Sequence, residues 1–332
     1  MKLKDILVTG GAGYIGSHTL VELHNSAYRP IIVDNLSNTS LSNIKGAENI
    51  IKKKITFYEF DCNDENQMNE LFKLESNIQA VIHFAAFKAV EESVREPKKY
   101  YDNNIGSLEV LLKTMKRYKV NNIIFSSSCT VYGSPDILPV SELAPFKRAE
   151  SPYAETKQLC EKLIDEVDLN SISLRYFNPV GSHETCLIGD CSADKPNNLV
   201  PIICEVASGK RSTMQIFGND YNTIDGTCVR DYIHVVDLAK AHVAVLNHIL
   251  NCKKIKTAYN IGVGKGVSVQ EVVDSFEKTN NIKTSYKIGP RRAGDVEEIY
   301  SDNTKISTEL NWFPVMSFES ALKTAWIWEK NK

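Results

Sequence analysis

Short apolar runs alternate with longer stretches of helical periodicity along the first half of the chain. The apolar runs predict strands, and the stretches between them repeat apolar residues at the spacing of amphipathic helices. The predicted strands cover residues 6–8, 31–33, 55–58, 80–84, 122–125 and 172–176. One long helical stretch contains Pro97 and runs through Tyr118, and another begins at Ser151-Pro152. This alternation predicts an α/β fold, a doubly wound parallel sheet with helices on both faces.

The regular alternation weakens after Phe177. Segments rich in Gly, Asn and Asp at 178–198 and 218–231 surround a short helix and a strand, and the later elements predict a smaller α/β lobe. We expect a cofactor-binding domain over 1–177, completed by part of 230–262, and a substrate-binding lobe over 178–332. Open parallel sheets bind ligands at the carboxyl ends of their strands, so the expected site is a cleft between the two lobes.

The composition changes this picture mainly by exclusion. The 332 residues carry a net charge of −2, which provides no general attraction to nucleic acid or to an anionic membrane. No stretch approaches about 18 uninterrupted apolar residues, and the first residues lack the apolar region of a secretion signal. The eight cysteines contain no C-x-x-C pair and are expected to be reduced, mostly buried thiols. We expect a cytoplasmic protein that binds neither membranes nor nucleic acid.

Glycines between the first strand and the first helix carry the strongest ligand signal. The run from Gly10 to Gly16 satisfies G-x-x-G-x-x-G and, from Gly11, G-x-G-x-x-G. Glycine permits a tight turn and a close approach to a pyrophosphate, which the free N–H groups of the helix N-terminus then bind. Alone, the pattern also fits an ordinary strand-to-helix turn. Asp34 closes the second strand where a carboxylate accepts from ribose hydroxyls, so a Rossmann-like dinucleotide site is predicted.

The charges at the strand ends refine the expected cofactor. Asp34 would repel a phosphate on the ribose 2′-oxygen, and no arginine follows it directly. We therefore expect NAD rather than NADP. Asp61, at the end of the third predicted strand, fits either a contact with adenine or the cap of a helix.

Tyr153 and Lys157 form the candidate catalytic pair. Tyr153 is the one tyrosine among 14 that has a lysine four residues later, and on a helix this spacing places both side chains on one face. A phenol with a pKa of about 10 is only about 0.1% ionised at pH 7, so a tyrosine base needs a lowered pKa. A nearby ammonium and an oxidised nicotinamide would favour that. Ser128 ends the fifth strand and is expected in the same cleft, although a surface Tyr-Lys pair with strand-capping serines is the alternative.

The histidines show no spacing typical of a metal site. His83 is expected at a strand end, and His18, His234 and His242 are scattered among predicted helices and strands. Because no H-E-x-x-H or comparable pair occurs, we expect structural histidines and no catalytic metal.

Longer strings around these residues carry a family resemblance. They are TGGAGYIGSH from Thr9, HFAAFKAV from His83, YYDNN from Tyr100, SSSCTVYG from Ser126, SPYAETK from Ser151, RYFNPVG from Arg175 and FGNDYNTIDGTCVRDYIHV from Phe217. Over almost the whole chain they resemble the extended short-chain dehydrogenase/reductase family, and within it the UDP-glucose 4-epimerase family. The resemblance implies an isomerase that interconverts UDP-galactose and UDP-glucose by transient oxidation at sugar C4 with retained NAD. It also implies a homodimer.

The resemblance implies residue roles as well. Tyr153, Lys157 and Ser128 would be catalytic. Tyr153 would be the base, and Ser128 would assist it. The cofactor would contact Gly10, Gly13, Tyr14, Ile15, Gly16, Asp34, Asn35, Leu36, Ser37, Asn38, Thr39, Asp61, Cys62, Phe84, Ala85, Ala86, Phe87, Lys88, Asn103, Ser128, Tyr153, Lys157 and Phe177. The UDP-sugar would contact Lys88, Ser128, Tyr153, Asn178, Asn198, Leu199, Gln215, Ile216, Phe217, Arg230, Arg292, Asp295 and Ile299. Independently of the family, guanidinium groups suit a diphosphate, although without the resemblance Arg291-Arg292 fits a solvated pair better.

Other functions on the same fold stay open at this point. A nucleotide-sugar 4,6-dehydratase or decarboxylase is one, but a dehydratase of this superfamily usually has an Asp-Glu pair where Cys129-Thr130-Val131 follows Ser128. A non-enzymatic sensor of NAD or UDP-sugar is another, which the intact Ser128, Tyr153 and Lys157 disfavour. Three positions depart from the family pattern: Ala86 replaces a frequent glycine, Cys129 a common alanine, and Ile299 a tyrosine or a small residue.

Overall fold

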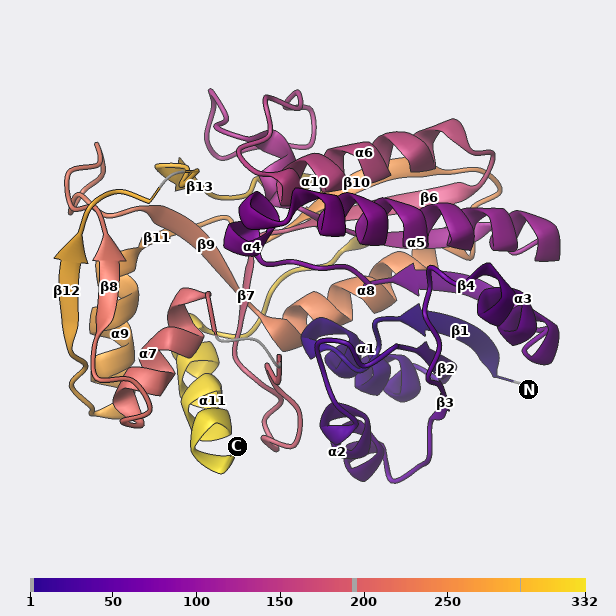
Figure 1. The fold of residues 1–332 in the computed structure, drawn as a ribbon, viewed down its shortest axis with the longest axis horizontal. Coiled ribbons are helices and arrows are strands. Elements are labelled where there is room, and N and C mark those ends of the chain that lie inside the picture. Colours follow the sequence, from indigo (N-terminus) through magenta and orange to yellow (C-terminus); the bar gives the residue numbers. More distant parts are fainter. Residues whose placement is uncertain (1–2, 193–195, 293) are drawn as a thin grey trace.

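A parallel sheet forms the centre of the protein (Figure 1). The structure, a computed structural model, describes residues 3–192, 196–292 and 294–332. Within these ranges seven strands pair in parallel, in the order β10-β6-β5-β4-β1-β2-β3. They are β1 (Lys4–Thr9), β2 (Tyr28–Val33), β3 (Thr56–Tyr58), β4 (Ile78–His83), β5 (Asn122–Ser128), β6 (Asn170–Tyr176) and β10 (Lys256–Ile261). The order reverses between β1 and β4, which confirms the predicted doubly wound, Rossmann-like fold.

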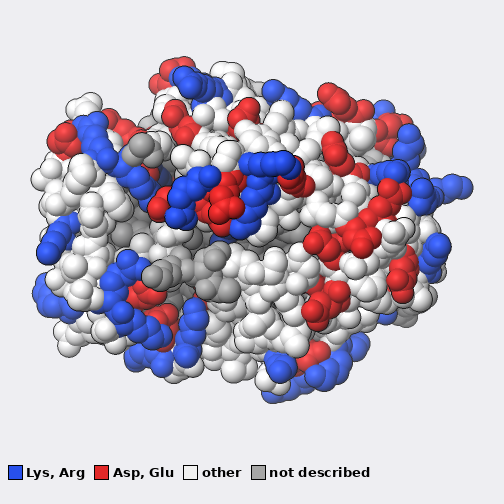
Figure 2. All heavy atoms as spheres, in the orientation of Figure 1, with Lys and Arg blue, Asp and Glu red and all other residues white. Residues whose placement is uncertain are grey.

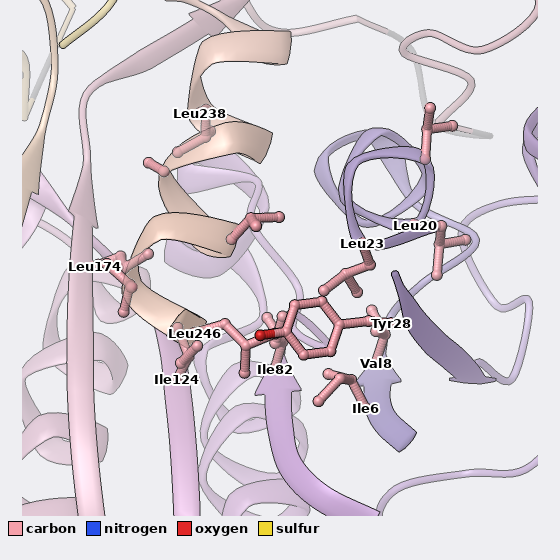
Figure 3. Close-up of a cluster of buried hydrophobic side chains, with 14 of the residues drawn as sticks. Ile6, Val8, Leu20, Leu23, Tyr28, Ile82, Ile124, Leu174, Leu238 and Leu246 are labelled. Carbon is pink, nitrogen blue, oxygen red and sulfur yellow. The ribbon is translucent and has the colours of Figure 1, made fainter. Parts of the chain in front are cut away.

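Helices cover both faces of this sheet. One face packs against α1 (Tyr14–Asn25), α2 (Ser42–Ile51), α8 (Val235–Ile249) and α10 (Thr304–Leu310), and the other against α3 (Glu65–Leu74), α5 (Pro97–Tyr118) and α6 (Pro152–Glu166). Successive strand residues point to opposite faces, so Ile6 and Val8 enter one core while Leu7 enters the other. Figure 3 shows the first core, where Leu246 of α8 lies near Ile124 of β5. Burial on both faces explains why these strands read as continuous apolar runs.

The long helical stretch predicted before Tyr118 is two helices rather than one. The first is α4 (Val90–Arg95), and α5 begins at Pro97. Proline has no N–H and disfavours the helical conformation in the residue before it, so the chain leaves the helix at Glu96, which has φ −129° and ψ 60°.

The second lobe is smaller, and its short strands pair both in parallel and antiparallel. Its sheets use β7 (Asn178–Val180), β9 (Val229–His234), β11 (Gly266–Ser268), β13 (Glu298–Ile299), and the pair β8 (Met214–Phe217) and β12 (Tyr286–Gly289). Its helices are α7 (Leu199–Ala207), α9 (Val269–Asn280) and α11 (Phe318–Asn331), and their apolar faces share one core. After β9 the chain returns through α8 to the edge strand β10 of the main sheet. None of the helices in the described ranges has both the length and the apolar character needed to cross a bilayer.

A buried ion pair ties the central strands to α6. Arg175 of β6 donates from Nη2 to Oε2 of Glu161 at 2.8 Å and from Nε to Oε1 at 3.1 Å, and less than a tenth of either side chain is exposed. Arg175 also donates to the Tyr132 hydroxyl, and Ser127 donates to Glu161. The pair therefore fixes the end of β5, directly beside Ser128.

Arg175→Met is expected to destabilise the protein by about 3–5 kcal/mol, because it leaves the Glu161 carboxylate buried without its charge partner. Urea unfolding followed by circular dichroism measures the change. As a control, Lys98→Met removes an exposed pair with Asp102 and should leave the unfolding midpoint nearly unchanged. A midpoint for Arg175→Met as close to wild type as that of the control would contradict the structural role of the pair.

Candidate active site

A cavity of about 550 Å³ lies at the carboxyl ends of the central strands, between the two lobes. The main domain contributes the β1–α1 turn, the ends of β2, β4 and β5, and the start of α6. The smaller lobe contributes α7, β9 and the segment around Arg292. Both signs of charge occur side by side near the middle of the face in Figure 2. An anionic ligand therefore depends on local groups within the cavity.

The glycine turn is built for close approach of backbone segments. Gly10 has φ +69°, and a Cβ on it would lie 2.7 Å from the Ala85 nitrogen. A Cβ on Gly16 would lie 2.4 Å from the Gly10 oxygen, so α1 can approach the turn only with glycine there. No described side chain caps the N-terminus of α1 at Gly13. This N-terminus faces the cavity and fits the pyrophosphate of a dinucleotide.

Asp34 is held against this turn at the end of β2. Its Oδ2 accepts from the Ala12 nitrogen at 3.1 Å, and its Oδ1 accepts from the Leu36 nitrogen at 3.0 Å. Burial raises the pKa of Asp34, and the two backbone hydrogen bonds partly oppose that effect. The carboxylate lines the cavity where a ribose would lie beside the turn.

The structure decides between the two interpretations of Asp61. The cap of α3 is Asp64, which accepts from the nitrogens of Asn66 and Gln67. Asp61 instead accepts from the Asn63 nitrogen at 2.8 Å and from Asn35 Nδ2 at 3.0 Å. The helix-cap interpretation was therefore wrong, and a contact with adenine stays a prediction.

Ser128, Tyr153 and Lys157 meet in the cavity wall. Ser151 caps α6 by accepting from the Ala154 nitrogen, so Tyr153 lies in the first turn of that helix. Lys157 donates from Nζ to the Ser126 oxygen at 2.6 Å, and its Nζ lies 5.9 Å from the centroid of the Tyr153 ring. Because Lys157 is only 3% exposed, the alternative of a surface Tyr-Lys pair is wrong. Ser128 does accept from the Thr130 nitrogen at 3.3 Å, so it caps the short helix after β5 as well as facing the cavity.

Burial dominates the titration of this group. It raises the pKa of Tyr153 to about 12, and a hydrogen bond with Ser128 only partly opposes it. Burial also lowers the pKa of Lys157 to about 8, while the neighbouring Cys160 and Glu161 act in the opposite direction. The expectation that Lys157 would lower the pKa of Tyr153 is therefore not met by the chain alone. A working base at Tyr153 needs further positive charge in the cavity.

The opposite part of the cavity holds two guanidinium groups and one carboxylate. Arg292 donates to Asp295 from Nη2 at 2.7 Å and from Nε at 3.1 Å. Arg230 lies 3.8 Å from the same carboxylate and donates to the Val229 oxygen. The three groups carry one net positive charge and retain unused donors, which suits a diphosphate.

Most of the predicted site residues line this one cavity. Those outside its walls are Leu36, Gln215, Ile216 and Phe217. Leu36 packs against the main core, and Ile216 is buried in the core of the smaller lobe. Phe217 lies beside the site, since the Arg292 guanidinium is 5.2 Å from its ring centroid. Between the predicted residues Arg292 and Asp295, residue 293 lies outside the described ranges.

Several cavity residues were not predicted. Asp190 and Ser192 come from the segment after β7, and Trp328 comes from α11. They belong to none of the spacings that indicate catalysis or phosphate binding. Only the packing of the two lobes brings them to the site.

Comparisons with known proteins place this chain in a family. A family model described as GDP-mannose 4,6 dehydratase matches residues 7–325. A UDP-glucose 4-epimerase of Dictyostelium discoideum is 46% identical over 329 residues, 98% of this chain and 95% of that protein. The crystal structure of UDP-glucose 4-epimerase from Bifidobacterium longum in complex with NAD+ and UDP is 44% identical, with a TM-score of 0.94 and coverage of 99% and 98%. The chain belongs to the extended short-chain dehydrogenase/reductases and, among them, to the UDP-glucose 4-epimerase family, as the sequence predicted.

In protein stripped of cofactor, Tyr153 is expected to stay protonated up to about pH 11, because burial raises its pKa to about 12. The difference in phenolate absorbance between wild type and Tyr153→Phe isolates this one tyrosine during a pH titration. A difference signal that appears near pH 7 without cofactor would show that the chain alone activates the phenol.

Proposed function

We propose that this protein interconverts UDP-galactose and UDP-glucose through oxidation and reduction at sugar C4, with Tyr153 as the base. The observation that carries the proposal is the convergence of the glycine turn, the buried Tyr153 and Lys157, and the two arginines on one cavity. The family and the NAD+ and UDP bound to the Bifidobacterium longum enzyme agree with it, so the predicted activity and the predicted cofactor are confirmed.

The residues of the main domain fit NAD. The N-terminus of α1 would hold its pyrophosphate, Asp34 a ribose, and Lys157 the nicotinamide ribose. When bound, NAD supplies a reversible hydride acceptor and a positive charge beside Tyr153. That charge favours the phenolate, which burial alone disfavours.

The proton of the sugar 4-hydroxyl passes to Tyr153 Oη, and Ser128 Oγ orients that hydroxyl. The same proton returns when the alcohol forms again. Arg230 and Arg292 hold the diphosphate, so the sugar is attached to the protein mainly through UDP. A sugar held in this way can present either face to the cofactor.

A 4,6-dehydratase activity fits the cavity less well. Elimination across C5 and C6 needs groups that remove and deliver protons there, and Cys129, Thr130 and Val131 follow Ser128 instead of an acid pair. Burial raises the pKa of the Cys129 thiol to about 12, so it is a poor proton donor at neutral pH. The dehydratase named by the matching family model is therefore not the function that we propose.

We further propose the division into a cofactor domain over 1–177, with α8 and β10 added, and a UDP-sugar lobe over the rest of the chain. A homodimer in the cytoplasm completes the proposal. The cysteines support that compartment, since all eight are free and six are buried.

NAD is expected to copurify with the protein, because the reaction returns the hydride and never requires exchange of the cofactor. Denaturation of the purified protein followed by an enzymatic assay of the supernatant measures the bound nicotinamide. Product analysis after incubation with UDP-galactose, without added NAD, tests the activity itself. Protein that contains no nicotinamide and needs added NAD for every turnover would disprove retention.

Tyr153→Phe is expected to lower turnover by at least about 100-fold while the bound NAD stays near wild-type content, since the change removes one hydroxyl and leaves the other predicted cofactor contacts in place. Lys157→Ala should lower both turnover and NAD content. Turnover of the Tyr153 variant close to that of wild type would reject the assignment of the base.

Ile299 is expected to restrict the cavity at the sugar. It is 3% exposed and packs in β13 beside Cys129 and Phe177, whereas Tyr300 lies outside the cavity walls. Its β-branched side chain is stiff, so UDP-glucose and UDP-galactose should be preferred over their N-acetylated forms by at least about tenfold in kcat/KM.

Steady-state kinetics with both substrate pairs, in wild type and in Ile299→Cys, measure this preference. The variant should gain activity toward the N-acetylated pair, because the smaller side chain leaves room for the acetamide. Equal use of both pairs by wild type, or an Ile299→Cys variant without that gain, would exclude Ile299 as the restriction.

A further inference from the structure

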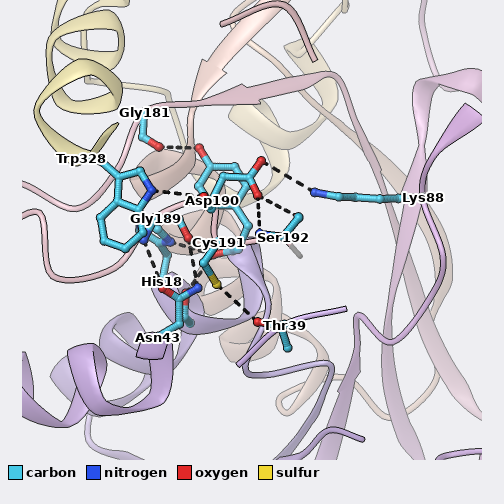
Figure 4. A network of polar contacts seen from close by, with 12 residues as sticks. His18, Thr39, Asn43, Lys88, Gly181, Gly189, Asp190, Cys191, Ser192 and Trp328 are labelled. Carbon is cyan, nitrogen blue, oxygen red and sulfur yellow. Dashed lines mark hydrogen bonds and ion pairs between the residues drawn. The ribbon is translucent and has the colours of Figure 1, made fainter. Parts of the chain in front are cut away.

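The segment after β7 contributes residues to the cavity wall and makes polar contacts with both lobes (Figure 4). We call Gly181–Ser192 the strap. It follows β7 and carries three of the cavity residues, Gly181, Asp190 and Ser192. No helix or strand is assigned to it, yet residues of both lobes hold it in place.

The first set of contacts joins the strap to the cofactor domain. The Tyr14 hydroxyl of α1 donates to the Gly181 oxygen at 2.5 Å. Asn43 of α2, which is fully buried, donates from Nδ2 to the Gly189 oxygen at 3.0 Å and accepts from the Gly189 nitrogen at 3.3 Å. One side chain thus satisfies both backbone groups of Gly189. Gly46 of α2 also packs so closely on the strap that a Cβ there would lie 2.0 Å from the Leu187 oxygen.

The second set joins the strap to α11 of the other lobe. Trp328 donates from Nε1 to the Asp190 oxygen at 3.1 Å, and its indole lies on Gly189, where a Cβ would be 2.5 Å from the ring. Ser182 donates from its nitrogen to Thr324 Oγ1 at 3.1 Å and from Oγ to the Thr324 oxygen at 2.9 Å. The strap is therefore fixed between α2 and α11.

The Asp190 side chain extends this connection across the cavity. Its Oδ2 lies 3.9 Å from Nζ of Lys88, which follows β4, and its Oδ1 accepts from Ser192 Oγ at 2.9 Å. Burial would raise the pKa of Asp190, but Lys88 and Ser192 outweigh that effect and hold it below its usual range. Asp190 and Lys88 both line the cavity, so their ion pair connects the strap to the segment that follows β4.

We propose that the strap retains the dinucleotide, and that Asn43 and Trp328 are positioning residues that act on the cofactor through it. The inference rests on the proposed function only for the identity of the occupant, NAD. When a dinucleotide leaves past the strap, the strap must move, and its contacts with the two lobes must break. An enzyme that regenerates its own cofactor gains from such a barrier, whereas an ordinary dehydrogenase must exchange the cofactor in each cycle.

Two variants loosen the strap without changing a residue of the cavity wall. Asn43→Ala removes both hydrogen bonds to Gly189, and Gly189→Ala places a methyl group against the Trp328 ring. Asn43 also donates to the Ala12 oxygen at 3.3 Å in the glycine turn, but Gly189→Ala leaves that contact intact. Agreement between the two variants therefore assigns an effect to the strap.

Trp326→Leu is the matched control. Trp326 lies two residues before Trp328 on α11 and is 9% exposed, but its ring packs on Phe276 in the core of the smaller lobe. The substitution should destabilise the same helix, α11, without removing a contact to the strap. A variant that releases NAD only because α11 is less stable would behave as this control does.

The experiment follows the release of labelled NAD from loaded protein into an excess of unlabelled NAD. Both strap variants should release the label about tenfold faster than wild type, as the loss of one or two hydrogen bonds would produce, while Trp326→Leu should resemble wild type. Two results would overturn the proposal. One is release of the label from both strap variants at the wild-type rate, and the other is a control variant that releases the label as fast as the strap variants. Epimerase activity with saturating NAD, measured on the same samples, tests the proposed function separately.

Discussion

The approach of three backbone segments at the end of β1 is the constraint on which the rest of the site depends. Gly10 leaves no room for a side chain against Ala85, and Gly16 leaves none against Gly10. These contacts set the distance between the first helix and the sheet, and Asp34 is fixed to the same turn through Ala12. The parallel pairing of the strands then places His83 at the end of β4, before the segment that carries Lys88, and Ser128 at the end of β5.

The ionisation of Tyr153 and Lys157 is set by the burial that also stabilises the sheet. Burial disfavours both the phenolate of Tyr153 and the ammonium of Lys157, so the chain alone holds the base that we propose in its neutral form. Electrostatic interactions are stronger in such surroundings than in water. A cation that enters the cavity therefore has a large effect on the phenol. In the proposed mechanism, activation of the base is therefore coupled to cofactor binding, because burial keeps Tyr153 neutral without the cofactor.

The sequence predicted the elements that have a local cause. Strands buried on both faces produce apolar runs, glycines mark a turn that excludes Cβ, and a Tyr-Lys pair at helical spacing places two groups on one face. It missed the break before Pro97 because helical periodicity continues across it. It left Asp61 ambiguous because the true cap of α3, Asp64, is a second aspartate three residues away. The electrostatics of Tyr153 could not be predicted either, since they depend on how completely other elements exclude water.

The strap could not be predicted because its cause is entirely nonlocal. Asn43 and Gly189 are 146 positions apart, and Trp328 follows Asp190 by 138. None of these residues belongs to a spacing that indicates chemistry, and each contact uses backbone groups that every sequence has. Yet the strap joins α2, in the first part of the chain, to α11 at its other end. The glycine turn can be found as a motif because its geometry is local, whereas the strap can be found only where the completed fold brings distant segments together.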